Sequence, residues 1–393
     1  MSLLDLEVQA ILVVTASACA LPGVFLVLRR LALMSDAISH SILFGIVLAF
    51  FITRDLSSPL LIGGAALAGI VTVLLVEGLH RTRLVKEDAA IGLVFPVLFC
   101  IGVLLISGFL RGVHLDENCV LLGKPEFAPF NRLVIGGEAT ASAEHADHGH
   151  VMPTRGGIDL GPKSLWVMGI ILIINLTFIL LFYKELKLAT FDASLAAALG
   201  FAPWLLHYGL MVLVSITAVG AFETVGSILV VALMIVPPAT AYLLTDRLAW
   251  MIGFSALLAA LCGVLGYWLA HPRMLDTCIS GSMATVAGAM FSLVLLFAPQ
   301  RGVLAVLRRR QQQRWDFAQL MLAIHLFNHE KTADAERENR IDHLQEHLNW
   351  DPRFARRVVR RAERRGLIRL EEEGMLRLTT PGRAAAEQAL QLQ

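Results

Sequence analysis

The sequence predicts an all-α polytopic membrane protein with eight to nine transmembrane helices, followed by a small cytoplasmic α+β domain of the winged-helix type. Hydrophobic residues make up 56% of the 393 residues and charged residues only 17%, against about 25% charged residues in typical soluble domains. Residues 1–300 carry 15 basic and 19 acidic side chains, whereas residues 301–393 carry 18 and 13. A disordered chain and a single soluble domain are therefore excluded. We predict a transmembrane domain at 1–300, a linker at 301–315 and the winged-helix domain at 316–393.

The transmembrane domain is predicted from apolar stretches long enough to cross a hydrocarbon core of ~30 Å. The sixth and seventh stretches are separated only by Glu223 and Thr224, so a re-entrant turn or one broken helix there would change the count. The candidate spans are 8–28, 35–53, 59–79, 89–109, 164–182, 204–222, 225–244, 249–270 and 283–299.

The distribution of basic residues predicts that the N-terminus lies outside the cell membrane. In that orientation the internal segments 29–34, 80–88, 183–203 and 245–248 hold 8 Lys and Arg in 40 residues, and the external segments hold 7 in 80. The ninth span then delivers the basic tail, with Arg308, Arg309 and Arg310, to the cytoplasm.

An ionisable residue inside a span indicates a functional site by default, and Asp36 and His40 are such residues. They are four positions apart in one predicted helix, so they share a face. A carboxylate and an imidazole together can form half of a site for a divalent transition metal. The alternative is a helix N-terminus capped by Ser35 or Asp36, with an ordinary packed histidine.

Two further sets of residues could attract cations. Glu223 can draw cations to the outer mouth, or be a solvated loop residue. The long external loop 110–163 contains His145, His148 and His150 beside two acidic residues, a pattern that can bind Zn²⁺ or Mn²⁺ weakly. A solvated polar loop explains the same residues.

The chain contains no GxxxxGK[ST] phosphate-binding motif. We therefore expect that it is not an enzyme and does not hydrolyse ATP itself.

The C-terminal pattern is that of three helices, a hairpin and a last helix. Apolar spacing predicts helices over 316–327 and 341–348, and Asp351-Pro352 opens a third helix that stops at Gly366. Residues 367–378 read as strand, turn and strand. The third helix carries arginines that can bind phosphates, among them Arg356, Arg357, Arg360, Arg361 and Arg364.

Three segments of the membrane part resemble the signature of the ABC-3 family, the permeases of bacterial ABC importers for zinc, manganese and iron. They are the run from Leu28 to His40, the run from Phe191 to Gly200, and the run from Val225 to Leu244. The resemblance covers roughly residues 5–300. The external stretch 136–160 departs from it, since shorter loops are usual.

The resemblance implies a membrane permease of the bacterial inner membrane that moves Mn²⁺, Fe²⁺ or Zn²⁺ as its substrate, without a bound cofactor. It implies that Asp36 and His40 contact the ion, and that the cytoplasmic coupling segment 183–203 contacts an ABC ATPase. The coupling residues would be Phe191, Asp192, Leu195, Leu199 and Gly200. A metal-binding lipoprotein or periplasmic protein would deliver the ion, and a second permease chain, identical or different, would complete the pathway.

The tail resembles the DNA-binding domain of iron-dependent, diphtheria-toxin-repressor-like regulators in its helix order and its Leu378–Arg383 ending. DNA is therefore one expected partner of the tail, and anionic lipid or the ATPase are others. Two alternative functions remain open from the sequence: a membrane-anchored metal-responsive DNA-binding regulator, and a permease for a metal chelate.

Overall fold

The computed structural model describes residues 3–54, 60–109, 123, 125–135, 158–271, 274, 276–330, 339–341, 344, 348–371 and 374–391. The chain forms two compact units, Met1–Ala298 and Pro299–Gln393. We call them the membrane unit and the C-terminal unit.

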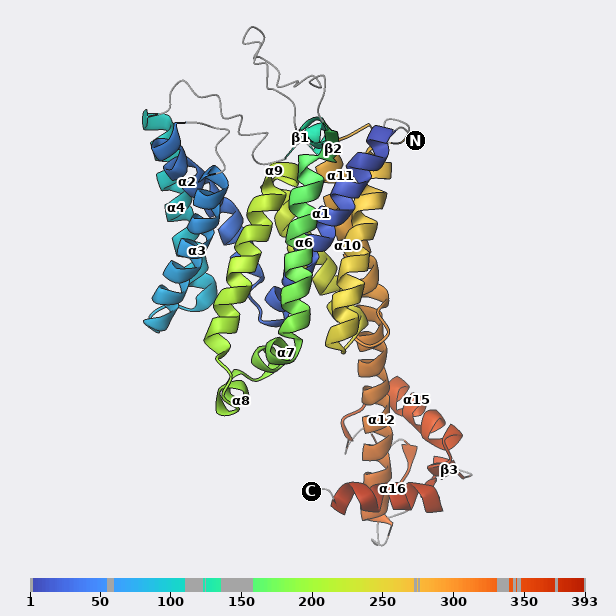
Figure 1. Ribbon diagram of the computed structural model, residues 1–393. Helices are drawn as coiled ribbons and strands as arrows, with labels where there is room; N and C mark the ends of the chain where they lie inside the picture. The colour runs from blue at the N-terminus through green and yellow to red at the C-terminus, as the bar shows by residue number, and fades with distance from the viewer. Residues whose placement is uncertain are drawn as a thin grey trace. The chain divides into compact units, whose positions relative to one another are not determined.

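The membrane unit is a bundle of long apolar helices (Figure 1). Among the described residues, eight helices are long and apolar enough to cross a membrane, which confirms a polytopic protein. They are α1 (Leu3–Leu28), α2 (Ala32–Thr53), α3 (Leu60–Arg81), α4 (Glu87–Phe109), α6 (Lys163–Leu181), α9 (Pro203–Leu244), α10 (Leu248–Ala270) and α11 (Ile279–Phe297).

Helix α9 contains both the sixth and the seventh predicted spans. It is broken between them, at Gly226. That residue has φ 78° and ψ 164°, a conformation open essentially to glycine alone. The first half of α9 begins beside the C-terminal end of α1, where His207 lies 3.5 Å from Arg29. The break lies near the start of α11, where the Ser280 hydroxyl donates to the Val225 carbonyl at 3.3 Å.

The second half of α9 runs back towards the C-terminal end of α1, where the first half began. The start of α11 shares a pocket with Asp5 at the start of α1. Nearer the C-terminal end of α1, a Cβ atom placed on Gly23 would lie only 2.0 Å from the carbonyl oxygen of Met234, which is in the second half of α9. The two halves of α9 therefore run in opposite directions, and the sequence-based expectation of two spans there agrees with one broken helix.

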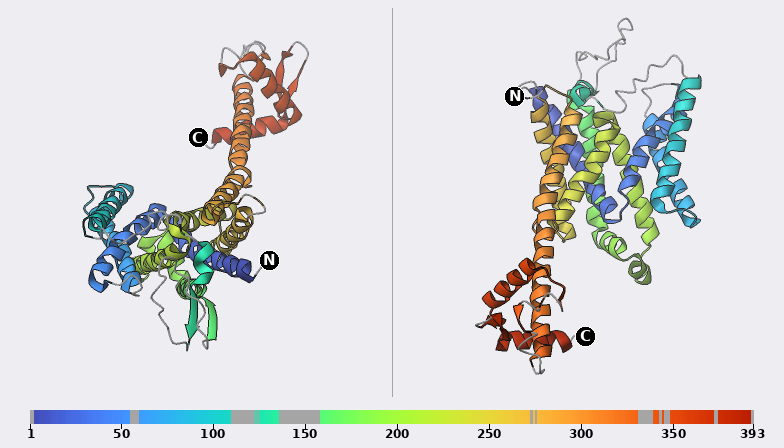
Figure 2. Two further views of the ribbon diagram at one scale, coloured as in Figure 1. Left: turned by 90° about the horizontal axis from the view of Figure 1, so that it is seen from above. Right: turned by 180° about the vertical axis from the view of Figure 1, so that it is seen from behind.

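Helix α1 is the centre of the membrane unit, and α2 to α4 form a group at one side (Figure 2). The side chains of Leu12, Cys19 and Phe25 on α1 are fully buried. Helix α2 packs closely on α3 through small residues, since a Cβ atom on Gly45 would lie 2.3 Å from the Gly64 carbonyl oxygen. Such residues let helix backbones approach in an apolar surrounding, and they fix the position of α2.

Short elements lie at the two ends of the helices. At the end where α1 begins are η1 (Pro125–Phe130) and a two-stranded antiparallel sheet of β1 (Arg132–Ile135) and β2 (Ile158–Pro162). This small sheet departs from the all-α expectation. Its β-branched and aliphatic residues favour an extended chain. At the opposite end are α7 (Tyr183–Phe191) and α8 (Ala193–Ala198).

The C-terminal unit has its own apolar core, which includes Leu322, Leu326, Leu344, Val358 and Leu376. Its elements are α12 (Val303–His329), α15 (Pro352–Arg364), β3 (Ile368–Leu370), β4 (Leu376–Leu378) and α16 (Thr380–Gln391). Strands β3 and β4 pair antiparallel, with Ile368 opposite Leu378.

The predicted third helix occurs as expected, because the Asp351 carboxylate caps α15 by accepting from the Arg353 amide at 3.1 Å and Pro352 occupies its first turn. Within the predicted linker 301–315, the residues from Val303 onward form the first turns of α12. Arg, Gln, Leu and Ala are all good helix formers, which agrees with a helical conformation for this basic, Gln-rich stretch. Most of the predicted second helix lies outside the described residues, although Leu344 and Leu348 are helical.

Candidate functional site

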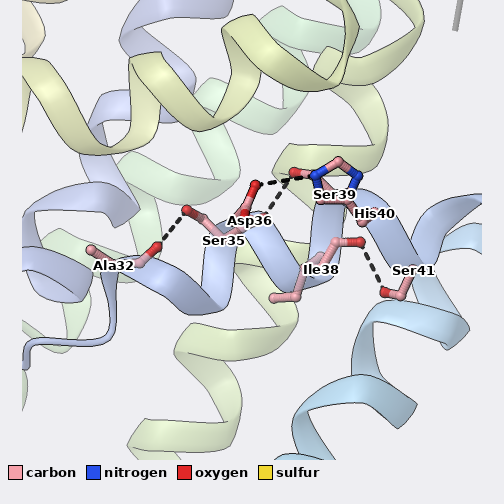
Figure 3. A network of polar contacts seen from close by, with 7 residues as sticks. All are labelled: Ala32, Ser35, Asp36, Ile38, Ser39, His40 and Ser41. Atoms are coloured by element: carbon pink, nitrogen blue, oxygen red, sulfur yellow. Dashed lines mark hydrogen bonds and ion pairs between the residues drawn. The ribbon is translucent and has the colours of Figure 1, made fainter. Parts of the chain in front are cut away.

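Asp36 and His40 lie on the second and third turns of α2 and face each other (Figure 3). The His40 Nε2 atom is 3.3 Å from the Asp36 Oδ1 atom, and the side chains of His40 and Asp36 are 30% and 37% exposed. The capping alternative is wrong. The N-cap of α2 is Leu31, which makes no side-chain cap, and Ser35 donates its hydroxyl to the Ala32 carbonyl at 2.8 Å.

Two aromatic side chains of α4 hold the imidazole of the pair in place. The His40 ring stacks on Phe95 at 5.6 Å between ring centroids, and Phe99 meets its edge at 6.0 Å. The neighbouring serines Ser39 and Ser41 donate their hydroxyls to backbone carbonyls of α2 at 2.8 and 2.9 Å. Asp36 and His40 are the only titratable side chains in the sequence of α2, so they alone give this face its metal-binding chemistry.

The pair supplies two ligands, one carboxylate oxygen and one imidazole nitrogen. Structural and catalytic zinc sites use three or four protein ligands. Within the described part of the chain, His, Cys, Asp and Glu side chains do not gather in a group of three or more that could hold a metal ion. Among the described residues, the Asp36–His40 pair therefore offers fewer ligands than such zinc sites use.

The other predicted cation ligands do not join the pair in the residues that are described. Glu223 is exposed on α9, three residues before the break at Gly226. His145, His148 and His150 fall outside the described residues, so their predicted metal binding stays a prediction.

The membrane unit also has a pocket of about 700 Å³ at the end where α1 begins. Its lining includes Asp5, Glu126, His271 and Asp276. The hydroxyl of Tyr267 donates to the Asp5 Oδ1 atom at 2.8 Å there. Sequence reasoning missed this pocket, because its residues come from four separate segments. The residues of the Asp36–His40 pair do not line this pocket, and we give the pair more weight because its chemistry is specific.

The predicted coupling segment, residues 183–203, contains α7 and the short capped helix α8, and it has exposed apolar side chains. Helix α7 ends at Phe191, and Asp192 caps α8 by accepting from the Ser194 hydroxyl at 2.6 Å and from the Leu195 amide at 2.9 Å. These hydrogen bonds, the Ser194 bond first, lower the pKa of the Asp192 carboxyl.

The apolar side chains of this segment point outward. Phe191 is 63% exposed, Leu195 46% and Leu199 61%. Gly200 ends the segment with φ 86°, a left-handed conformation that glycine adopts without strain. All five predicted coupling residues therefore lie together at one exposed corner of the membrane unit.

The six arginines of α15 in the C-terminal unit and its C-cap, Arg365, fall into two sets. Three are engaged within the unit: Arg357 donates to the Arg353 carbonyl, Arg361 lies 4.0 Å above the Trp315 ring, and Arg365 pairs with Asp316. The side chains of the other four have no such partner among the described residues. This free arginine stripe, at intervals of three or four residues, consists of Arg353, Arg356, Arg360 and Arg364.

Comparisons with known proteins agree with the membrane architecture. The ABC 3 transport family matches this chain over residues 5–124 and 158–298, which leaves out residues 125–157 with η1 and β1. "Zinc transport system membrane protein TroD" of Treponema pallidum is 45% identical over 365 residues, 93% of each chain. "Manganese transport system membrane protein MntD" of Bacillus subtilis is 42% identical over 292 residues, 74% of this chain and 91% of its own.

A solved structure, "PsaBC from Streptococcus pneumoniae in complex with Fab", is similar with a TM-score of 0.61 and 25% identity. The similarity covers 78% of this chain and 96% of that chain. The TroD match is longer than the membrane unit, so it continues into the C-terminal unit.

Proposed function

Since the chain belongs to the ABC 3 transport family, we propose that its Asp36–His40 pair binds the metal ion that the transporter carries. The chain is the multi-pass membrane permease subunit of an ABC importer for zinc, manganese or iron ions. It is not itself an enzyme, and its ATPase is a separate subunit, as the family implies.

The geometry of the pair supports this role. A hard oxygen and a borderline nitrogen, 3.3 Å apart, suit Mn²⁺, Fe²⁺ and Zn²⁺ alike. Two ligands from one chain bind weakly, which suits transport, because the ion must leave as well as enter. Asp36 and His40 are about one-third exposed. A second permease chain, identical or homologous, can therefore bring its own pair to the same ion and complete a four-ligand shell.

Uptake of radiolabelled Mn²⁺, Fe²⁺ and Zn²⁺ tests the proposal in cells with and without this chain. Expression of the chain should raise accumulation of at least one metal, and Asp36→Asn should remove that increase while the protein still inserts and binds its ATPase. Normal accumulation in Asp36→Asn would refute the site assignment.

We propose that α8 docks on the ATPase through Phe191, Leu195 and Leu199. An exposed apolar face on a short helix is the kind of surface that fits a groove of a partner protein. Because α8 is capped at its start and lies at one end of the bundle, it would serve as a rigid attachment point for the ATPase on the membrane unit.

We propose further that the N-terminus of the membrane unit lies outside the cell and the C-terminal unit in the cytoplasm. The density of basic residues on the α7–α8 side supports this orientation. A metal-delivering lipoprotein or periplasmic protein would then bind at the end where α1 begins. Labelling of the exposed Cys278 in intact cells with a membrane-impermeant thiol reagent tests it, and labelling only after lysis would reverse the orientation.

For the C-terminal unit we propose a winged-helix fold and, as its second function, binding to DNA. The order α12, α15, β3–β4 and α16 supports the fold, and the free arginine stripe on α15 supports phosphate binding. Fluorescence anisotropy of the detergent-solubilised permease with a DNA duplex, at two salt concentrations, tests this function. Absence of salt-sensitive binding to any duplex would refute it.

A further inference from the structure

The turn between α1 and α2 carries a side chain that reaches two distant segments of the chain. The Arg29 Nε atom donates to the Thr190 hydroxyl of α7 at 3.2 Å. Its Nη1 atom donates to the Nδ1 atom of His207, in the second turn of α9, at 3.5 Å. One guanidinium therefore joins this turn to the helix that leads into α8 and to the start of α9.

The same turn is firmly connected to the metal-binding pair. Leu31 is buried, its amide donates to the Leu26 carbonyl at 2.8 Å, and its carbonyl accepts from the Met34 amide at 3.0 Å. Asp36 follows within the next turn of α2. Hydrogen bonds of Leu31 thus connect the turn that carries Arg29 to the first turn of α2, one turn before Asp36.

A second charge, partly buried, belongs to the same network: the side chain of Glu77 on α3 is 23% exposed and pairs with Arg81 at 2.8 Å. Arg81 also reaches the Tyr208 hydroxyl at 3.5 Å, and this hydroxyl interacts with the Glu77 carboxylate as well. His207 interacts electrostatically with both Arg29 and Glu77.

Each of these two charges has one unsatisfied atom. The Arg29 Nη2 atom and the Glu77 Oε2 atom are buried and have no hydrogen-bond partner among the described residues. Leaving buried charged groups unpaired is unfavourable. A guanidinium and a carboxylate that share a network, each with one orphaned atom, can lower that penalty by pairing with each other.

We propose that Arg29 is a positioning residue that couples the ATPase to the metal pathway by exchanging Thr190 and His207 for Glu77 between the two transport states. When the ATPase moves α8, α7 carries the Thr190 hydroxyl away from the guanidinium. Arg29 then pairs with Glu77, and α2 turns the Asp36–His40 pair with it. Two discrete pairings of one buried charge make a two-state element, which coupling between distant sites requires. The inference rests on the proposed roles of α8 and of the pair.

The experiment measures metal uptake and ATP hydrolysis by the complete transporter in proteoliposomes, with its ATPase and its metal-delivering protein. Arg29→Met should lower the metal moved per ATP hydrolysed by roughly 5–150-fold, the usual range of coupling between two sites, while hydrolysis continues. Arg29→Lys, which keeps the charge, should recover part of the loss. Arg30→Met is the matched control, because the Arg30 side chain is exposed, and it should behave as the unmodified protein.

Milder variants keep the inference testable where Arg29→Met does not assemble. Thr190→Val and Glu77→Gln keep the shape of each side chain, and each should lower the metal moved per ATP. The double variant Arg29→Lys/Glu77→Gln should lose less than the sum of the single losses, because both act on one pairing.

An unchanged ratio of metal to ATP in Thr190→Val and Glu77→Gln would overturn the inference, as would equal losses of uptake and hydrolysis in an assembled Arg29→Met complex. Asp36→Asn, measured beside them, separates the two levels. Normal uptake in Asp36→Asn refutes the metal-site proposal, whereas an unchanged ratio in the network variants refutes only the coupling role.

Discussion

The membrane unit and the C-terminal unit use charged side chains in opposite ways. In the membrane unit charges are few, and α2 carries only Asp36 and His40. In the C-terminal unit one helix, α15, carries six arginines and its C-cap is a seventh, Arg365, all exposed. A charged group is unfavourable in an apolar bundle, so a single charged pair in the membrane unit indicates a functional site. Exposed charges in water carry little free-energy penalty, so a helix of exposed arginines in the C-terminal unit does not by itself indicate a function.

In the C-terminal unit, the role of each arginine is indicated by whether its side chain has a partner inside the unit. Arg361 packs on Trp315 and Arg365 pairs with Asp316, so these two hold the unit together. Arg356 and Arg360 have no such task among the described residues. The same test applies in the membrane unit, where Arg29 and Glu77 each keep one buried atom unpaired.

The largest effect is expected from the Asp36–His40 pair, the proposed metal ligands. His40→Ala should lower metal uptake by at least roughly 100-fold, since loss even of the groups that support a ligand typically reduces metal affinity or activity 10–100-fold. The control is His271→Ala, which removes an imidazole from the pocket near the start of α1 and should retain uptake. Equal losses in both variants, measured with radiolabelled metal in cells, would contradict a special role for the pair.

The next effect concerns the break in α9. Gly226→Ala forces a Cβ atom into a conformation with φ 78°, and such strain amounts to about 1–3 kcal/mol. We expect less inserted protein and a lower unfolding temperature in detergent. Gly169→Ala on α6 is the control, because a Cβ atom there meets open space and alanine favours a helix. A Gly226→Ala protein as stable as Gly169→Ala would show that the two halves of α9 do not need this break.

A smaller effect is expected at the exposed cap of the coupling segment. Asp192→Ala removes the acceptor of the Leu195 amide and should destabilise α8 locally. Co-purification of the ATPase should fall accordingly. Asp192→Asn keeps an acceptor and should retain more of the partner, and an identical yield of ATPase with all three proteins would exclude the cap from docking.

The pH dependence of this cap follows from the direction of its pKa shift. Hydrogen bonds from Ser194 and Leu195 lower the pKa of Asp192, so folding of α8 is favoured at any pH above the unfolded value of about 3.9. The stabilisation is lost only as the pH falls through the lower folded value. ATPase binding that weakened between neutral pH and pH 5 would therefore have a different origin.

The sequence predicted the elements whose signals are local. Apolar length gave the spans, and the spacing of Asp36 and His40 gave a shared helix face, which the structure bears out at 3.3 Å. Contacts between distant parts of the chain were not predicted. The network of Arg29, Thr190 and His207 joins residues more than 150 positions apart, and no periodicity in the sequence reveals such contacts.

The smallest effect separates the two sets of arginines on α15. If the free arginine stripe binds DNA phosphates, Arg356→Ala should lower the slope of log affinity against log salt by about 0.9, the contribution of one phosphate contact. Arg361→Ala should leave that slope unchanged. It should instead destabilise the C-terminal unit by about 0.5–2 kcal/mol, the value of a cation–π contact, because Arg361 lies on Trp315.

Anisotropy titrations at several salt concentrations and thermal unfolding of both variants measure the two quantities on the same protein. The division of these arginines by partner is correct only if Arg356→Ala changes the salt slope alone and Arg361→Ala changes the stability of the C-terminal unit alone. Equal salt slopes in Arg356→Ala and the unmodified chain would mean that exposure alone, without a partner inside the unit, does not identify a binding residue.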